Sequence, residues 1–309
     1  MKILVTGGAG YIGSVLVPHL LQQGHLVSVL DNLRFGGAGL LSVYEHPHFT
    51  LYKGDIGDEV LVREAMRGKD AVVHLAAFVG EPQCSRNPDE AWRVNYKETL
   101  VLAKLAKKLQ VPHFVFASTC SNYGVTGPGD FATEGSNLNP LALYAETKVK
   151  AEQALAGNET VAILRLATVY GLSPRMRFDL LINEFARDAV TGWLLVYGAD
   201  SWRPFVHVQD VARFISLTLT NHLTGVFNVG GHNRKKAALV EALKHVCPDL
   251  QVEFKEGKID LRNYRVSFDK AKLVGFTPEF TPESGLQNVA VAVQEGFFTD
   301  SHSNQYRNA

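Results

Sequence analysis

Runs of apolar residues alternate with amphipathic stretches along the first half of the chain. Most runs are apolar at nearly every position rather than at every second one, which predicts strands buried on both faces of a sheet. The predicted strands span 2–6, 26–30, 49–54, 71–77, 113–118 and 160–166. The stretches between them predict helices over 11–23, 59–66 and 89–109, and from Tyr144 onward.

Strand–helix alternation of this kind places the strands in one parallel sheet joined by right-handed crossovers, with helices on both faces. The predicted fold class is therefore α/β, with a doubly wound parallel sheet. The long helices carry small residues such as Ala145, Ala151 and Ala154. These residues could pack against a second subunit or against the core of the same chain.

The alternation changes after Gly171. A helix is predicted over 175–190, a strand over 194–198, a strand and helix over 203–219, a strand at 252–254 and a last helix over 282–298. Because no Pro/Gly/Ser-rich linker intervenes, we expect a smaller C-terminal substrate-binding lobe packed on the first domain, with the active site between them.

The predicted boundaries follow from this change. The first domain covers 1–171 and regains 204–230, the substrate lobe covers 172–203 and 231–300, and a tail covers 301–309. The polar tail is expected to be frayed.

Composition excludes some classes of function but does not identify one. The 309 residues are 46% hydrophobic and 20% charged, and the 31 basic and 31 acidic side chains cancel. A neutral chain gives no electrostatic argument for nucleic acid or an anionic membrane, so any anion site must be local. Cys84, Cys120 and Cys247 show no metal-ligand or disulfide spacing, and no metal is expected. Without a signal-peptide pattern or a membrane-length apolar run, we expect a cytoplasmic enzyme.

The first motif with chemistry is LVTGGAGYIG, directly behind the first predicted strand and ahead of the first helix. Gly7 allows a tight turn, Gly10 lets the backbone approach a phosphate, and Gly13 allows close helix–strand packing. The helix N-terminus that follows offers free N–H groups and a partial positive charge. The stretch predicts a dinucleotide site of the Rossmann type, and Tyr11 and Ile12 are expected to contact the cofactor.

Acidic residues after the next two strands predict how the cofactor's nucleoside would be held. Asp31 ends the second strand about twenty residues after the loop, where a carboxylate accepts the ribose hydroxyls and repels a 2′-phosphate. NAD is therefore expected rather than NADP, although Arg34 nearby would suit a phosphate. Asp55 and Ile56 are expected to contact the adenine, and Asn32 is assigned to the same cofactor site.

The fourth strand ends in HLAA at the carboxyl edge of the sheet, where ligands bind in such folds. The small side chains of Ala76 and Ala77 let the backbone lie close to the cofactor, and Leu75 is expected to contact it as well. His74 lies inside an apolar strand and is interpreted as a core histidine rather than a base.

A tyrosine and a lysine stand four residues apart in YAETK, which puts both on one helix face. A tyrosine with its usual pKa of about 10 is a poor base at neutral pH. An ammonium beside it would lower that pKa, so Tyr144 with Lys148 could move a hydroxyl proton. Ser118 and Thr119 follow the fifth strand, and Thr119 is expected to hydrogen-bond the same substrate oxygen.

These motifs, in this order, resemble the extended short-chain dehydrogenase/reductase family, and within it the nucleotide-sugar epimerases and dehydratases. The resemblance rests on GGAGYIG, Asp31, HLAA, STxxxYG, YAETK and RPFVHVQDVA, and covers most of the chain. It implies NAD in a Rossmann-like domain, a nucleotide-diphosphate sugar as substrate and a homodimer. It also implies Thr119, Tyr144 and Lys148 as the catalytic residues, with Lys148 on the nicotinamide ribose. Asn95 matches a family asparagine near the cofactor.

Further residues are assigned to the substrate. The resemblance places Arg203 and Arg265 at phosphate-binding positions and Asn183 at a family asparagine in the same region. Forked arginine donors suit a diphosphate. Arg177 is added for its proximity to the site alone, and Glu81 as a contact to a sugar hydroxyl.

The residues after Thr119 separate the family's reactions. All of these reactions begin with hydride transfer to NAD, and the 4-keto sugar is then reduced on its other face, loses water or carbon dioxide, or epimerises beside the ketone. Dehydratases of the family carry Asp-Glu where this chain has Cys120 and Ser121, which are expected to face the substrate. Small unionised residues suit an epimerase. Cys120 also matches the acid/base cysteine of 3,5-epimerases, so it could be either a small spacer or an acid/base.

The sequence therefore predicts an NAD-dependent nucleotide-sugar epimerase acting at C4 through a transient 4-keto sugar. The alternatives are a 4,6-dehydratase, a 3,5-epimerase, a 4-ketoreductase and a dehydrogenase of another small substrate. Intact Thr119, Tyr144 and Lys148 argue against a non-catalytic NAD-sensing protein.

Overall fold

A seven-stranded sheet forms the centre of the first lobe. The computed structural model describes residues 1–127, 129–256 and 262–308. The strand order is β10-β6-β5-β4-β1-β2-β3, and all neighbouring strands are parallel. The strands are β1 (Lys2–Thr6), β2 (Leu26–Asp31), β3 (Phe49–Lys53), β4 (Ala71–His74), β5 (His113–Thr119), β6 (Val161–Leu166) and β10 (Gly225–Val229). The predicted α/β fold with a doubly wound parallel sheet is confirmed.

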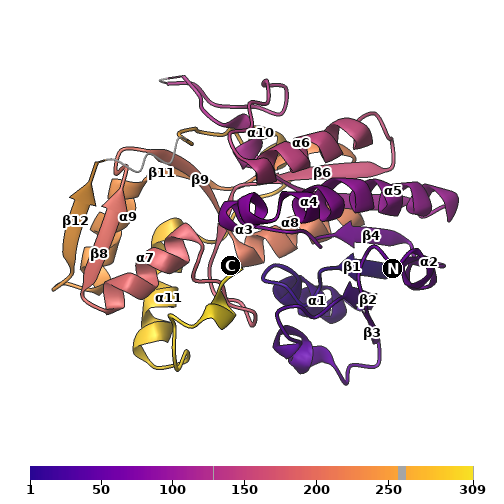
Figure 1. The fold of residues 1–309 in the computed structure, drawn as a ribbon, viewed down its shortest axis with the longest axis horizontal. Coiled ribbons are helices and arrows are strands. Elements are labelled where there is room, and N and C mark those ends of the chain that lie inside the picture. The colour runs from indigo at the N-terminus through magenta and orange to yellow at the C-terminus, as the bar shows by residue number, and fades with distance from the viewer. Residues whose placement is uncertain (128, 257–261, 309) are drawn as a thin grey trace.

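Helices cover both faces of this sheet, as Figure 1 shows. They are α1 (Gly13–Gln22) and α8 (Val208–Thr220) on one face, and α2 (Glu59–Met66), α5 (Thr99–Lys108) and α6 (Leu143–Leu155) on the other. Successive side chains of a strand point to opposite faces. Ile3 accordingly packs in one core with Leu16 and Phe214, whereas Leu4 packs in the other with Leu102. Two buried faces explain why the strands are continuously apolar.

The connections reverse direction between β1 and β4. The chain first runs outward from β1 through β2 to β3, and then returns to place β4 on the other side of β1. Loops that leave the carboxyl ends of these two strands diverge and open a crevice, where ligands bind in doubly wound sheets. The crevice lies between Gly7, which follows β1, and Leu75, which follows β4.

The second lobe is built on two small sheets. One sheet has the order β11-β9-β7 and the other pairs β12 with β8. Its elements are β7 (Thr168–Tyr170), α7 (Leu181–Val190), β8 (Trp193–Tyr197), β9 (Trp202–His207), β11 (His232–Lys235), α9 (Lys236–Val246), β12 (Gln251–Lys255) and α11 (Pro282–Gln294). A separate core contains Phe178, Phe205, Leu239 and Leu286. The chain between β9 and β11 returns to the first lobe as α8 and β10, so the return begins near Val208 rather than at 204.

Several predicted elements differ in extent; the last helix, for example, is predicted over 282–298 and ends at Gln294. The strand predicted over 71–77 ends at His74, and Leu75 makes one more backbone hydrogen bond, to the Thr6 carbonyl at the end of β1. The helix predicted over 89–109 consists of α4 (Pro88–Trp92), a wider π-helical turn at Arg93–Glu98 and α5. The helix predicted over 175–190 begins only at Leu181, because the Phe178 N–H donates to the Tyr306 carbonyl instead of to a helical turn.

The described part of the tail is ordered against the second lobe, so the frayed tail predicted over 301–309 is wrong for residues up to 308. A short 3₁₀ turn spans Asn304–Tyr306. Figure 1 shows the C-terminus at the centre of the molecule, between the two lobes. In the described part of the chain, no helix has both the length and the apolar character needed to cross a bilayer.

A buried ion pair beneath β5 and α6 supports the sheet. Glu152 of α6 pairs with Arg165 of β6 at 2.7 Å, and Ser118 and Asn122 also donate to its carboxylate. Glu152→Ala would leave Arg165 buried without its counter-charge, which is expected to lower the free energy of unfolding by about 3–5 kcal/mol. Urea unfolding measures this decrease in stability, as a shift of the unfolding midpoint at an unchanged m value.

Gln153, exposed on the same helix, provides the control. Gln153→Ala is expected to change the free energy of unfolding by less than about 0.5 kcal/mol. Equal midpoints for the two variants would show that the ion pair does not stabilise the fold.

Candidate active site

A cavity of about 620 Å³ lies between the carboxyl edge of the main sheet and the second lobe. Most of the residues predicted for the site line it. These are Gly7, Gly10, Tyr11, Ile12, Gly13, Asp31, Asn32, Asp55, Ile56, Leu75, Ala76, Ala77, Glu81, Thr119, Ser121, Tyr144, Lys148 and Arg177. Asn95, Cys120, Asn183, Arg203 and Arg265 are not among the lining residues.

The glycine loop is packed so closely that side chains would not fit. A β-carbon on Gly7 would lie 2.6 Å from the Ala76 nitrogen, and one on Gly13 would lie 2.5 Å from the Gly7 carbonyl oxygen. Gly7 also has φ +74°, which glycine adopts readily. Ile12, the N-cap residue of α1, makes no side-chain cap hydrogen bond, and the N–H groups of Ser14 and Leu16 already donate to the carbonyls of Gly10 and Ile12. What this end offers an anion is the positive end of the helix dipole and the N–H groups just before Ser14. The loop therefore fits the phosphates of a dinucleotide.

Asp31 fixes the loop from the end of β2. One carboxylate oxygen accepts from Ala9 N at 3.0 Å and the other from Leu33 N at 2.8 Å. Each oxygen keeps acceptor capacity for a ribose hydroxyl. Burial raises the pKa of Asp31, and the two backbone N–H groups oppose that rise.

Two other predicted cofactor residues are held by their neighbours. Asp55 accepts from Asn32 at 3.2 Å and from Arg93 at 3.3 Å. Asn95, in the π-helical turn, bonds the N–H and the carbonyl of Phe78 at 2.7 and 3.0 Å. Asn95 therefore does not line the cavity. It positions the backbone of Phe78, which does.

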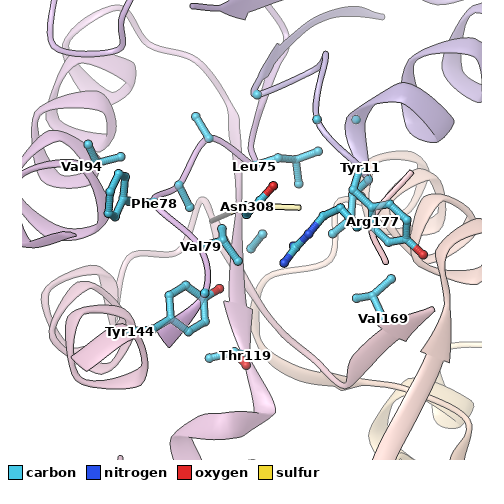
Figure 2. Close-up of a pocket in the computed structure, with 18 of the residues that line it drawn as sticks. Tyr11, Leu75, Phe78, Val79, Val94, Thr119, Tyr144, Val169, Arg177 and Asn308 are labelled. Carbon is cyan, nitrogen blue, oxygen red and sulfur yellow. The ribbon is translucent and has the colours of Figure 1, made fainter. Parts of the chain in front are cut away.

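The structure brings Thr119, Tyr144 and Lys148 together on one wall. Thr119 ends β5, whereas Tyr144 and Lys148 lie on α6, and the Lys148 ammonium donates to the Ala117 carbonyl at 2.8 Å. Figure 2 shows Tyr144 and Thr119 on one side of the cavity, with the Arg177 side chain reaching in from the other.

The electrostatics of this wall differ from the prediction. Burial lowers the pKa of Lys148 to about 7 and raises that of the Tyr144 hydroxyl, and the charge that opposes the rise at Tyr144 is Arg177. The expected lowering of the Tyr144 pKa by Lys148 is not met in this structure, because the rise caused by burial is larger and the charge that opposes it is Arg177.

Glu81 has a role that the sequence did not indicate. The N-cap residue of α6 is Ala142, which has no side-chain acceptor. Glu81, from α3 (Glu81–Arg86), supplies one, because its carboxylate oxygens accept from Leu143 N and Tyr144 N, both at 3.2 Å. A carboxylate here also complements the helix dipole. Glu81 therefore holds the first turn of the helix that carries Tyr144 and Lys148.

Cys120 and Ser121 diverge after Thr119. Ser121 lines the cavity, whereas Cys120 is fully buried and its thiol donates to the Arg165 carbonyl at 3.1 Å. Burial raises the pKa of the Cys120 thiol well above its usual value. The expectation that Cys120 faces the substrate is not met, because its side chain points into the core between the sheet and α8.

Two of the four site residues predicted after Gly171, Arg177 and Asn183, contact each other. Arg177 lines the cavity and pairs with Asp179 at 2.7 Å. Asn183 is buried, where it accepts from Gly171 N at 2.9 Å and donates to the Arg177 carbonyl at 2.9 Å and to the Tyr11 hydroxyl at 3.1 Å. Asn183 therefore joins the glycine loop to the second lobe and does not reach the cavity.

The two predicted phosphate arginines also lie outside the cavity. Arg203 is buried in β9 and donates to its neighbour's carbonyl at 2.8 Å. The Arg265 guanidinium lies 4.5 Å from the Phe131 ring centre and 5.2 Å from that of Trp202. In this structure neither residue meets the expected role as a cavity-lining contact to a substrate diphosphate.

Several lining residues were missed, and the most consequential are Arg175, Arg307 and Asn308. Arg175 lies two residues before Arg177. Two arginines this close together in the sequence could have indicated that both line the site. Arg307 and Asn308 belong to the predicted tail, and no sequence pattern indicates that a polar tail folds back into a cavity.

Comparison with known proteins gives one consistent family. Residues 3–230 match the model of the NAD dependent epimerase/dehydratase family. A dTDP-glucose 4,6-dehydratase of Streptomyces niveus is 32% identical over 311 residues, covering 93% of this chain and 90% of that protein. A UDP-glucose 4-epimerase of Lactobacillus helveticus is 30% identical over 274 residues, covering 80% and 82% respectively.

Solved structures of this family have the same fold as the chain. The UDP-glucose 4-epimerase of Thermus thermophilus, in complex with NAD, superposes with a TM-score of 0.83 at 28% identity, over 95% of this chain and 99% of that one. Because relatives with different reactions match about equally well, overall similarity does not choose between those reactions.

Gly13→Ala tests the dinucleotide cradle. The added carbon would meet Gly7 and Gly8 backbone atoms at 2.5 Å, so the loop must shift. We expect NAD affinity, measured by calorimetric titration, to fall about tenfold or more. Gly135→Ala, where the nearest atom is 4.0 Å away, should leave the affinity unchanged. Unchanged affinity in Gly13→Ala would contradict a role of this loop in NAD binding.

Glu81→Ala tests the cap on α6. Loss of the acceptor leaves two helix N–H groups unpaired and is expected to cost about 1 kcal/mol of stability. It should also speed amide hydrogen exchange at Leu143 and Tyr144. Ser85→Ala removes a hydroxyl that donates to the same carboxylate, yet leaves the cap intact, and should not change the exchange. Equal exchange rates in all three proteins would rule out capping by Glu81.

Proposed function

The chain belongs to the NAD-dependent epimerase/dehydratase family, and from that premise we propose that it epimerises a nucleotide-diphosphate sugar at C4 through a transient 4-keto sugar. The proposal rests mainly on the wall beside Thr119, where the next lining side chain is the uncharged Ser121. A sugar that must present first one face and then the other needs space there, and loss of water needs an acid and a base.

The position of Cys120 supports the same reaction. A thiol that is buried, has a raised pKa and donates to a backbone carbonyl is poorly suited to proton transfer beside a ketone. This observation disfavours the 3,5-epimerase reading. It leaves Cys120 as a small residue that fills the core under the catalytic wall.

The catalytic residues then divide the work. Bound NAD supplies the hydride acceptor at the start of the reaction and the hydride donor at the end. We assign to Tyr144 the removal of the proton from the C4 hydroxyl and its later return. Thr119 would hydrogen-bond the same oxygen, and Lys148 would hold the nicotinamide ribose. The positive charge of Arg177 favours the Tyr144 phenolate that this role requires.

Substrate contacts are proposed only for residues on the cavity wall. Ser121 would face the sugar, and Arg177 would face the nucleotide diphosphate, whose geometry suits a guanidinium. Glu81 lines the cavity close to Tyr144, but its carboxylate is already engaged by the helix. A homodimer and a cytoplasmic location remain predictions from the sequence.

Tyr144→Phe tests the mechanism. Removing the hydroxyl is expected to lower turnover of a nucleotide sugar by about 10²–10⁴-fold. NAD should stay bound, because the ring and Lys148 remain. The assay follows sugar isomers by chromatography, and NAD by heating the protein and measuring the released nicotinamide nucleotide. Unaltered turnover would refute the role of Tyr144.

The same assay distinguishes the family's reactions. The wild-type protein should interconvert C4 epimers from a panel of nucleotide sugars with no net change in NADH. A 4-keto-6-deoxy product, net NADH consumption or solvent deuterium beside a ketone would each contradict C4 epimerisation.

A further inference from the structure

Residues Ser303–Asn308, called the strap below, leave the second lobe and cross the cavity. The ring centre of Tyr306 lies 5.6 Å from that of Phe178 and 5.5 Å from that of Phe298, both edge-on. The Phe178 N–H donates to the Tyr306 carbonyl at 2.9 Å. These contacts anchor the strap in the core of the second lobe.

Beyond Tyr306 the strap reaches the first lobe. Asn308 N donates to Asp179 at 3.4 Å on the second-lobe side. With the Gln83 amide oriented to satisfy its neighbours, its nitrogen donates to the Asn308 carbonyl and its oxygen accepts from Arg34, both at 3.0 Å. Figure 2 shows Asn308 in the middle of the cavity, between Val79 on one wall and Arg177 on the other. The strap therefore bridges the two lobes across the cavity.

Arg175 connects the strap to the glycine loop. Its guanidinium donates to the Arg307 carbonyl at 3.0 Å and lies 4.3 Å from the Phe35 ring centre. Its backbone N–H donates to the Ser14 hydroxyl at 3.3 Å, in the first turn of α1. A β-carbon on Gly39 would lie 2.8 Å from the Cβ of Ser14 and 3.4 Å from that of Arg175. The backbone of Arg175 therefore lies next to the N-terminus of α1, at the positive end of the helix dipole.

Polar atoms of these residues are buried on the cavity without partners. Among the described residues, Arg175 Nε, Arg307 Nε and Asn308 Oδ1 find no hydrogen bond. Arg175 is only 6% exposed. An unpaired buried polar atom costs about 1–3 kcal/mol, more when it is charged. The two guanidinium N–H donors, Arg175 Nε and Arg307 Nε, would be stabilised by an anionic ligand oxygen, whereas Asn308 Oδ1 would need a donor.

The charges around the strap favour an anion. Burial and the neighbouring Arg177 lower the pKa of Arg175 to about 10, and Asp179 opposes this. Asp179 is itself engaged by Arg177. Glu184 of α7 also lies within electrostatic reach of Arg307, and Arg187 pairs with Glu184 at 3.9 Å. Arg175, Arg177 and Arg307 thus gather at the strap, where Arg177 already engages Asp179.

We propose that the strap closes the cofactor cleft and that Arg307, together with Arg175, completes the site for the pyrophosphate of bound NAD. Two diphosphates would enter this cavity, one from NAD and one from a nucleotide sugar. The pyrophosphate of NAD is favoured because the Arg175 backbone N–H is bonded to Ser14 in the first turn of α1, which places this residue beside the glycine loop. The inference rests on NAD binding and not on the reaction proposed above.

Arg307→Ala in the holoprotein tests the proposal. We expect the NAD dissociation rate, followed after dilution of the holoprotein, to rise about tenfold, the loss expected for one charged hydrogen-bond donor. UDP affinity, measured calorimetrically on the holoprotein, should not change. Arg307→Lys keeps the charge but not the fork, and should give an intermediate rate. Gln305→Ala, exposed on the same strap, is the matched control and should release NAD at the wild-type rate.

The possible results distinguish a role of Arg307 at the NAD pyrophosphate from a role at the substrate diphosphate. Wild-type NAD release from both Arg307 variants would overturn the proposal. Weaker UDP binding with unchanged NAD release would also overturn it, in favour of the substrate diphosphate. If Arg307→Ala unfolds, Arg307→Lys carries the test, and its wild-type release rate would have the same meaning. None of these measurements uses a sugar, so failure of C4 epimerisation would leave them unaffected.

Discussion

The close backbone approach at Gly7 is the constraint on which the site depends. A β-carbon at this residue would lie 2.6 Å from the Ala76 nitrogen, so the ends of β1 and β4 meet without side chains between them. The chain can then turn at positive φ and enter α1 with no side-chain cap from the N-cap residue Ile12. Because the sheet reverses its strand order at the same place, the crevice and the anion-binding helix end coincide.

The second lobe stabilises this loop from the other side. The Tyr11 hydroxyl donates to the Gly171 carbonyl at 2.6 Å, Asn183 donates to the same hydroxyl, and Ser173 donates to the Tyr11 carbonyl at 2.7 Å. All these groups are buried, so breaking one bond leaves an unpaired polar atom. The position of the glycine loop is therefore linked to that of Arg177, whose carbonyl Asn183 also holds. The glycine loop and the second lobe are therefore joined by one hydrogen-bond network.

Site residues could be predicted where local spacing sets their position, but not where their role depends on contacts with distant parts of the chain. Gly7, Asp31, Tyr144 and Lys148 were predictable because strand, loop and helix spacing already sets which edge or face each occupies. The capping role of Glu81 was not, because its partners at Leu143 and Tyr144 lie far along the chain. The order of the motifs identified the family. It could not show in which direction a side chain next to a motif points.

The sequence by itself determined the doubly wound sheet, its glycine loop and the shared face of Tyr144 and Lys148 on α6, since these depend on periodicity, glycine positions and helical spacing. Only the tertiary structure decided that Cys120 turns into the core while Ser121 faces the cavity, and that Arg265 stacks on Trp202 instead of lining the site. It also decided that Arg307 and Asn308 cross the cavity. The physical reason is that these outcomes depend on which distant surfaces meet, and packing of the two lobes sets that.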